Sequence, residues 1–307
     1  MSVIAVAGGT GNVGRAIVET LAQSSKHKVI VLARKAKTVL ENVPTLAIDY
    51  TNVDATAKVL EQYDVGVIIS AIQVTDETSS AAEISLIKAA EQSSTASRFI
   101  ASGWGSLPNE ASPTLAFSRA SEDSLRNTAL EWTRFSVGLF LDYYGMPAIK
   151  THLPPMSFAV DMNSKKAALP GTGNEPFAFI YSYDVGKFVS AFLDVPKWEE
   201  ITYIYGEKTT WNGFIKVASE VSGSTFEVSY DPIEKLAKGE VTELPSHKEE
   251  LAKSPFPEPI ARQLLAVLGY WVVGGQFDIP VDKSLNKIFS SIKPMGVRDM
   301  LLARQSS

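Results

Sequence analysis

The sequence predicts an α/β protein built on a doubly wound parallel sheet. Short, wholly apolar runs such as Val3 to Ala7 are typical of strands buried on both faces of a parallel sheet. Segments with apolar residues at helical spacing separate these runs, which indicates βαβ units with right-handed crossovers. A glycine-rich turn, VAGGTGNVG at residues 6–14, joins the first strand to the first helix.

The remaining elements follow in a regular order. After the helix that begins near Asn12, strands are expected at residues 29–33, 46–48, 65–69, 98–102 and 132–137. A helix is expected around residues 84–90. Near Asp142 the alternation stops, and residues 145–176 carry the prolines and glycines of loops and short strands.

This change of pattern divides the chain. Residues 1–145 are expected to form a Rossmann-like nucleotide-binding lobe, and residues 146–307 a smaller C-terminal substrate lobe. Within the second part, a helix and a strand at about 183–206 are expected to return and pack on the first sheet. The polar, proline-rich segment 240–259 is typical of a surface excursion or lid.

Composition excludes several functions. The chain has 307 residues, 45% of them apolar, and a net charge of −5 without any dense basic patch, which argues against nucleic-acid binding. It has no cysteine and only three scattered histidines, so no metal site is expected. No apolar run is long enough to span a bilayer. The start of the chain has the pattern of a strand rather than a signal peptide, and a cytoplasmic protein without membrane contact is expected.

The glycine loop predicts a dinucleotide site. Gly8, Gly11 and Gly14 form G-x-x-G-x-x-G between a strand and an amphipathic helix. Glycines permit a tight turn, and the helix starting near Asn12 offers free N–H groups to a pyrophosphate. The alternative is an ordinary glycine turn before a helix.

The end of the second strand indicates which dinucleotide is bound. NAD-binding proteins usually place an acid there for the ribose 2′-hydroxyl, but this chain has no acid between Glu19 and Glu41. Instead Arg34 offers a planar fork to a 2′-phosphate, with Lys35 or Lys37 beside it. NADP(H) is therefore expected rather than NAD(H), unless these cations are only solvated surface charges.

Several segments resemble the NmrA-like and isoflavone-reductase-like family of atypical short-chain dehydrogenases/reductases, in particular its fungal members. The segments are GGTGNVG (8–14), LAR (32–34), RFIASGWG (98–105), EWTRFSVGLFLDYYG (131–145), PGTGNEPFAFIYSYDVGKFV (170–189), TTWNGFI (209–215) and VTELPS (241–246). The resemblance covers nearly the whole chain. It implies an NADP(H)-binding lobe, a smaller substrate lobe and a cleft between them.

The resemblance also implies which residues hold the cofactor. The pyrophosphate would lie against Gly8, Thr10, Gly11, Asn12, Val13 and Gly14, and the 2′-phosphate against Arg34 and Lys35. Near adenine and along the dinucleotide would lie Asp49, Tyr50, Ser70, Ala71, Ile72 and Gln73. The nicotinamide would be flanked by Ser102, Gly103, Trp104, Ser136, Val137 and Gly138.

The catalytic group is less clear from the sequence. The Tyr-x-x-x-Lys pair of short-chain dehydrogenases has one match, Tyr183 and Lys187, which points away from the apolar face of its helix and is interpreted as a surface pair. Isoflavone-reductase-like enzymes use a lysine on the helix after the fifth strand, and here Arg119 is nearest to that position. Arg119 would stabilise an oxyanion, or belong to a solvated charged stripe with Glu122 and Arg126.

Other residues are candidates for donating a proton or lining the substrate. Ser102 and Tyr143 are candidate donors, although the Ser102 hydroxyl could equally bond a nearby backbone group. Candidate substrate contacts are Trp104, Phe140, Tyr143, Tyr144 and His152. The tyrosines could instead pack under the site, and a lone histidine is more often at the surface or in the core.

Three functions stay open on the sequence. The first is an NADP(H)-dependent reductase of a small aromatic or polyketide-like molecule, from secondary metabolism and possible as a homodimer. The second is an NmrA-type regulator that senses NADP(H) and passes its state to a protein partner without turnover. The third is a non-redox isomerase or cyclase on the same scaffold. The substrate, the hydride face and the oligomeric state are not fixed by the sequence.

Overall fold

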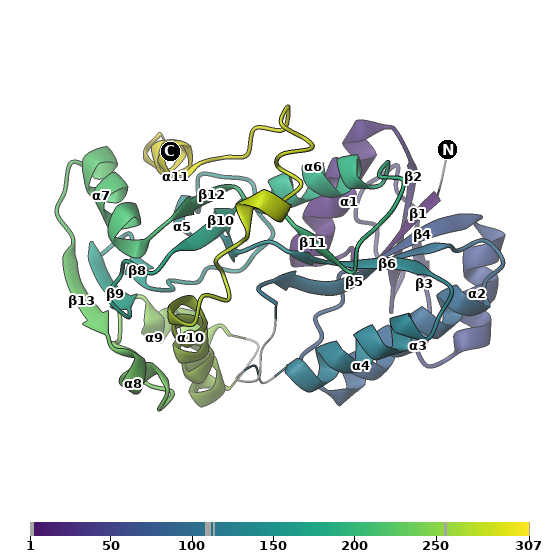
Figure 1. The fold of residues 1–307 in the computed structure, drawn as a ribbon, viewed down its shortest axis with the longest axis horizontal. Coiled ribbons are helices and arrows are strands. Elements are labelled where there is room, and N and C mark those ends of the chain that lie inside the picture. The colour runs from purple at the N-terminus through teal and green to yellow at the C-terminus, as the bar shows by residue number, and fades with distance from the viewer. Residues whose placement is uncertain (1–2, 108–111, 113, 255–256, 307) are drawn as a thin grey trace. The chain divides into compact units, whose positions relative to one another are not determined.

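The computed structural model describes residues 3–107, 112, 114–254 and 257–306 (Figure 1). By its internal contacts the chain forms two compact units. Unit 1 contains Met1–Ser136, Ser182–Ile204 and Val281–Ile292; unit 2 contains Val137–Tyr181, Tyr205–Pro280 and Lys293–Ser307. Unit 1 thus ends its first segment at Ser136 rather than near residue 145, and it includes a late segment, residues 281–292, that the sequence pattern did not mark.

A seven-stranded sheet forms the centre of unit 1. Its strands are β1 (Val3–Ala7), β2 (Lys28–Ala33), β3 (Thr45–Ala47), β4 (Val65–Ser70), β5 (Arg98–Gly105), β6 (Glu131–Ser136) and β11 (Ile201–Tyr203). They lie in the order β11-β6-β5-β4-β1-β2-β3, and every neighbouring pair is parallel. The predicted doubly wound parallel sheet is confirmed. Its strand order reverses between β1 and β4, where such sheets bind ligands.

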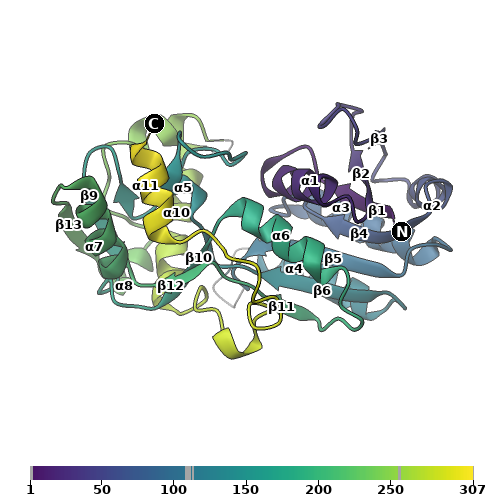
Figure 2. The same ribbon diagram turned by 90° about the horizontal axis from the view of Figure 1, so that it is seen from above.

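Helices cover both faces of this sheet. On one face lie α1 (Asn12–Ser24) and α6 (Ser182–Phe192), and on the other α2 (Val53–Gln62), α3 (Glu77–Gln92) and α4 (Leu115–Arg126) (Figures 1 and 2). Side chains cap the first turn of two of these helices: Asn52 Oδ1 accepts from the Ala55 amide, and Asp76 forms a capping box with Ser79. Buried residues of the strands and helices, including Leu86, Ile87 and Phe99, form the core between the sheet and the helices α2 and α3.

Residues from later in the chain complete unit 1. Helix α6 packs on α1, and a Cβ at Gly186 would lie 2.5 Å from Thr20 Oγ1, so only glycine allows the two helices to approach this closely. Strand β11 adds to the sheet beside β6 in parallel. A short 3₁₀ helix, η1 (Val281–Lys283), leads to Ser284, which forms a bridge with Tyr203.

Unit 2 is built from two small sheets and six helices among its described residues. One sheet has the order β12 (Glu207–Thr209), β10 (Phe177–Ile180), β7 (Leu139–Phe140), and the other β13 (Glu227–Asp231), β9 (Lys166–Pro170), β8 (Val160–Asp161). The helices are α5 (Asp142–Gly145), α7 (Trp211–Ser222), α8 (Ile233–Leu236), α9 (His247–Ala252), α10 (Glu258–Val273) and α11 (Val297–Gln305).

Aromatic side chains form the centre of unit 2. The Trp211 ring is fully buried and lies 4.7 Å from the Phe177 ring and 5.9 Å from the Tyr144 ring, measured between centroids. Tyr144 is 1% exposed, and its hydroxyl donates a hydrogen bond of 2.5 Å to the Phe158 carbonyl oxygen. Burial raises the pKa of Tyr144 well above its ordinary value, so the phenol keeps the proton that this bond needs.

Tyr144→Phe is expected to destabilise unit 2 modestly. The substitution removes one buried hydrogen bond but keeps the ring, so the free energy of unfolding should fall by about 1 kcal/mol. Urea unfolding followed by tryptophan fluorescence measures this change. Tyr230→Phe is the matched control, because Tyr230 is 49% exposed although its hydroxyl also has a partner, Asn212. Equal effects of the two substitutions would contradict the expectation.

Candidate functional site

The glycines at the end of β1 serve two different purposes. Gly8 has a φ of +76°, and a Cβ there would lie 2.4 Å from the Ala71 carbonyl oxygen. A Cβ at Gly14 would lie 2.4 Å from the Gly8 carbonyl oxygen. These two glycines therefore allow the loop, α1 and the end of β4 to pack closely.

Gly11 lies in open space instead. Its backbone is extended, with φ −124° and ψ 157°, and nothing lies within 4 Å of a Cβ built on it. It is the N-cap residue of α1, yet no side chain caps this helix and its first turn contains no acid. The first amide groups of α1 are thus left for an external anion, and a pyrophosphate fits this terminus. Around it Thr10 and Asn12 are exposed, whereas Val13 is buried in the core.

Cationic and aromatic residues lie at the ends of β2 and β3. Arg34 and Lys35 follow β2 directly and are exposed, and Arg34 forms no hydrogen bond or ion pair within the described part of the chain. The Tyr50 hydroxyl donates to the Leu32 carbonyl oxygen at 3.2 Å. Burial raises the pKa of Tyr50 to about 12, and the nearby positive charge of Arg34 opposes that rise. Asp49 is exposed, and hydrogen bonds from Thr51 lower its pKa.

The end of β4 is joined to its neighbours by main-chain groups. The Ala71 amide donates to the Ala7 carbonyl oxygen at 2.7 Å, and the Ser70 carbonyl oxygen accepts from Trp104 Nε1 at 3.0 Å. The Ser70 hydroxyl is buried and has no hydrogen-bond partner within the described residues. Ile72 is half-buried and Gln73 exposed.

Ser102 is engaged through all of its polar groups. Its hydroxyl donates to the Ile72 carbonyl oxygen at 2.5 Å, and its amide donates to Glu83 Oε1 at 2.8 Å. Its carbonyl oxygen accepts from Arg134 Nη1. A substrate carbonyl would have to displace Ile72 to receive the Ser102 proton. Next to this backbone, the half-buried Trp104 ring is stacked on Phe135 with centroids 5.4 Å apart.

The helix after β5 carries Arg119 on its surface. Arg119 is exposed on α4 and takes part in an interaction of its own. The other two residues of the expected stripe differ from one another. Arg126 pairs with Glu122, Asp123 and Glu200 at the surface, whereas Glu122 also lies 3.1 Å from the buried Arg134. The stripe is therefore only partly a solvated surface feature.

The remaining expected residues belong to unit 2. Val137 is buried, and Gly138 has a φ of +82° against the Ala178 carbonyl oxygen. Phe140 lies in β7, Tyr143 is half-buried on α5, and His152 is half-buried with a partner of its own. Tyr144 packs in the aromatic centre.

The Tyr183–Lys187 interpretation needs a correction. Tyr183 is buried between α6 and α1, where its hydroxyl donates to Glu19 Oε2 at 2.6 Å. Lys187 is half-exposed and forms an ion pair with Asp184 at 2.7 Å. The two residues are therefore not a surface pair, because each has a different partner.

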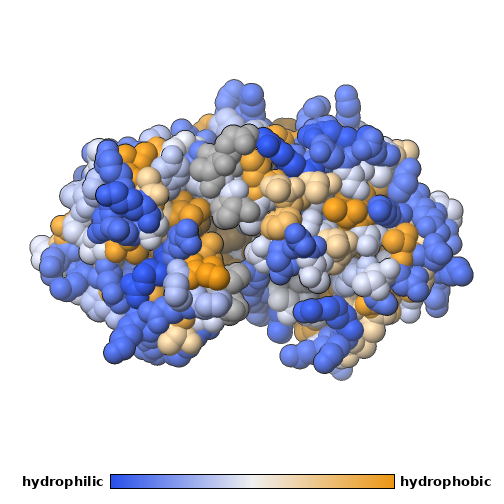
Figure 3. All heavy atoms as spheres, turned by 90° about the horizontal axis from the view of Figure 1, so that it is seen from below, coloured by the Kyte–Doolittle hydropathy of each residue, from blue (hydrophilic) through white to orange (hydrophobic). Residues whose placement is uncertain are grey.

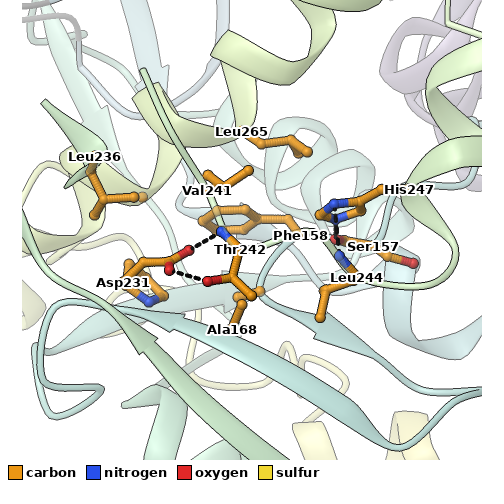
Figure 4. A pocket seen from close by; sticks show the side chains of 13 residues that line it. Ser157, Phe158, Ala168, Asp231, Leu236, Val241, Thr242, Leu244, His247 and Leu265 are labelled. Carbon is orange, nitrogen blue, oxygen red and sulfur yellow. Dashed lines mark hydrogen bonds between the residues drawn. The ribbon is translucent and has the colours of Figure 1, made fainter. Parts of the chain in front are cut away.

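Unit 2 also contains a small pocket lined mainly by apolar side chains, among them Phe158, Leu236, Val241 and Leu265 (Figure 4). Thr242 lines the pocket and donates two hydrogen bonds to Asp231, one from its amide at 2.8 Å and one from its hydroxyl at 2.6 Å. These bonds join two of the residues that line the pocket, and both residues belong to unit 2.

The same region contains a buried histidine and corrects one expectation. His247 has partners: its Nδ1 accepts from the Leu244 amide, so its Nε2 donates to the Ser157 carbonyl oxygen at 2.8 Å (Figure 4). The segment 240–259, of which residues 255–256 lie outside the described part, is not a loose excursion, because Leu244, His247 and Leu251 are buried.

Two properties of the described residues bear on other functions. No group of three or more histidine, aspartate or glutamate side chains is arranged to hold a metal ion within them. None of the helices in this part of the chain has both the length and the apolarity to cross a membrane. The face shown in Figure 3 carries polar side chains over most of its area, with apolar ones scattered among them.

The parallel sheet, the glycine loop and the uncapped start of α1 define a dinucleotide-binding protein of the Rossmann type. Residues 8–151 match a family model described as NAD(P)H-binding. The chain is 31% identical to "Oxidoreductase BOA1" of Botryotinia fuckeliana, over 95% of each chain, and 23% identical to "Phenylcoumaran benzylic ether reductase TP7" of Nicotiana tabacum, over 98% of this chain and 97% of the relative. A solved leucoanthocyanidin reductase–NADPH complex from Vitis vinifera shares the fold, with a TM-score of 0.76 at 16% identity and complete coverage of both chains.

The chain belongs to the NmrA-like and isoflavone-reductase-like family of atypical short-chain dehydrogenases/reductases. It is an NAD(P)H-binding protein of the isoflavone-reductase-like type. The resemblance seen in the sequence motifs is thereby confirmed.

Sequence reasoning missed Glu83 and Arg134, although both left a signal. Glu83 occupies a helical position three and four residues before Leu86 and Ile87, on the apolar face of α3. Arg134 is a charged residue inside a strand expected to be buried. A charge at a core position needs a partner, which makes both positions noteworthy.

Proposed function

We propose that this protein is an NADP(H)-dependent reductase that transfers a hydride to a small aromatic or polyketide-like molecule. The observation that carries the proposal is the arrangement at the carboxyl ends of β1 and β2. There an uncapped helix start at Gly11 lies in open space, and an exposed Arg34 follows the next strand. A pyrophosphate and a 2′-phosphate have the charges that these two features bind.

The substrate class is supported by the relatives and by the chemistry of the fold. The matched relative from Nicotiana tabacum is named a phenylcoumaran benzylic ether reductase, and the fungal relative is named an oxidoreductase. The cofactor, when bound, supplies the hydride, while the protein orients the reactants and provides a proton. We place Ser102–Trp104 beside the nicotinamide because they belong to the carboxyl-terminal part of β5, at the ligand-binding edge of the sheet.

The test is a turnover assay with purified protein. NADPH carrying deuterium at both C4 positions is incubated with a panel of aromatic enones, quinones, benzylic ethers and polyketide-like ketones, and products are analysed by mass spectrometry. Transfer of one deuterium to a product supports the proposal. Tight NADPH binding without transfer to any acceptor would instead favour an NADP(H)-sensing regulator, and conversion without NADPH consumption would favour an isomerase or cyclase.

Tyr143 is proposed as the proton donor of the reaction. A phenol of ordinary pKa, about 10, is already protonated at neutral pH. Burial and the neighbouring Asp142 raise the pKa of Tyr143 further, so this side chain can act as a proton donor there but not as a base. Tyr143→Phe is expected to lower kcat by roughly 100-fold, the usual size of a general-acid contribution, with NADPH affinity unchanged. Steady-state kinetics and a fluorescence titration measure the two quantities. A kcat equal to that of the wild type would remove Tyr143 from the mechanism.

A further inference from the structure

We propose that Glu83 and Arg134 act as positioning residues: together they form a clamp that fixes the Ser102–Gly103 backbone and α4 for hydride transfer. The inference rests on the proposed function, in which residues 102–104 lie beside the nicotinamide. Neither residue is assigned a role by the motifs of the sequence.

Glu83 is the acidic residue of the clamp. It is 1% exposed and forms no ion pair within the described part of the chain. Its Oε1 accepts from the Ser102 amide and its Oε2 from the Ser121 hydroxyl, both at 2.8 Å. A carboxylate in the interior is costly unless hydrogen bonds compensate for the lost water. Here both bonds go to β5 and α4, so the carboxylate joins these two elements.

Arg134 is the basic residue of the clamp. It is 3% exposed, and its Nη1 donates to the Ser102 carbonyl oxygen. Its Nε lies 3.1 Å from Glu122 Oε1, and its Nη2 is 3.5 Å from the Ser118 carbonyl oxygen, both on α4. Gly103 has a φ of +130°, and a Cβ there would collide with Arg134 Nη1. The positive φ and the close guanidinium therefore both favour glycine at this position of the SGWG motif.

The two charges act on successive peptide groups. Glu83 faces the N–H of residue 102 and Arg134 faces its C=O, while each also contacts α4. Apolar side chains of similar size would fill the same volume without the desolvation cost of two ions. The charges instead restrain the backbone direction at the carboxyl end of β5, where a small displacement of groups beside a reacting centre reduces the rate strongly.

The experiment compares the affinity for the whole dinucleotide with the affinity for its adenosine half alone. Affinities for NADP⁺ and for adenosine 2′,5′-bisphosphate, which lacks the nicotinamide half, are measured by calorimetry on the full-length chain. Glu83→Gln and Ser121→Ala are the variants. The expected result is about a tenfold or larger loss of NADP⁺ affinity with unchanged bisphosphate affinity, because the bisphosphate contacts only the β1–β2 end of the site.

Glu19→Gln is the matched control. Glu19 is also a buried glutamate of unit 1, but it bonds Tyr183 and Arg15 rather than Ser102. It is expected to lower the thermal midpoint without changing the ratio of the two affinities. If Glu83→Gln does not fold, Ser121→Ala decides, because it removes only one hydroxyl.

An unchanged affinity ratio in the folded variants would overturn the clamp and leave Glu83 a structural residue. A wild type that binds NADP⁺ but reduces no acceptor would contradict the proposed function alone, since the affinity ratio still tests the clamp. A wild type that binds neither probe would overturn both.

Discussion

Gly11→Asp is expected to abolish dinucleotide binding while leaving the fold intact. The extended backbone of Gly11 accommodates a side chain, and nothing lies within 4 Å of its Cβ. Aspartate is among the preferred N-cap residues, so α1 should be as stable as before or more so, by up to about 1 kcal/mol. The same carboxylate, however, would occupy the amide groups that a pyrophosphate needs and repel its charge.

The loss of NADPH affinity should be at least about 100-fold, because charge-assisted hydrogen bonds are lost and a like charge is added. A fluorescence titration with NADPH measures the affinity, and urea unfolding measures the stability. Gly11→Asn is the matched control, since asparagine caps a helix equally well without a charge and should weaken binding less. If Gly11→Asp bound NADPH as the wild type does, the start of α1 would not be the phosphate site.

This substitution is informative because the neighbouring glycines cannot serve the same purpose. A Cβ at Gly8 or Gly14 would lie 2.4 Å from a carbonyl oxygen. Alanine at either position would displace the loop itself, and a loss of binding there would report on packing rather than on phosphate contact.

Arg34→Ala is expected to reduce the preference for NADPH over NADH by about 10- to 100-fold, the range that corresponds to hydrogen bonds with a charged group. NADH lacks the 2′-phosphate, so its affinity should change little. The dissociation constants of both cofactors, measured at the same ionic strength, give the preference directly.

Lys37→Ala is the control for a general effect of positive charge, because Lys37 is exposed on the same segment but lies three residues beyond Arg34. A smaller change in preference is expected for it. Equal losses in the two variants would indicate diffuse attraction rather than a specific phosphate contact. An undiminished preference in Arg34→Ala would assign the 2′-phosphate to other residues.

The sheet and the glycine loop of unit 1 could be predicted from the sequence, because the patterns that indicate them are local. The apolar runs of β1, β2 and β4 indicate strands buried on both faces of the sheet, and a glycine turn followed by an amphipathic helix indicates a phosphate-binding loop. Each of these patterns lies within a short window of the chain. The doubly wound parallel sheet was predicted from them, whereas the family was identified from longer motifs along nearly the whole chain.

Errors arose where a residue's partner lies far along the chain. Helical periodicity placed Tyr183 away from the apolar face of α6, yet Glu19, on a helix from the start of the chain, buries its hydroxyl. Similarly, the polar composition of residues 240–259 indicated a lid, but Leu244 and His247 pack into unit 2. Periodicity describes one helix or strand and carries no information about what covers it.

By itself the sequence determined the doubly wound sheet, the glycine loop and the cationic end of β2, because backbone preferences and burial patterns depend on residues that are close together in the chain. Only the tertiary structure decided how Ser102 is used. Its hydroxyl, amide and carbonyl are engaged by Ile72, Glu83 and Arg134, which come from three other segments. Buried polar groups must be paired, and the fold rather than the local sequence supplies the partner.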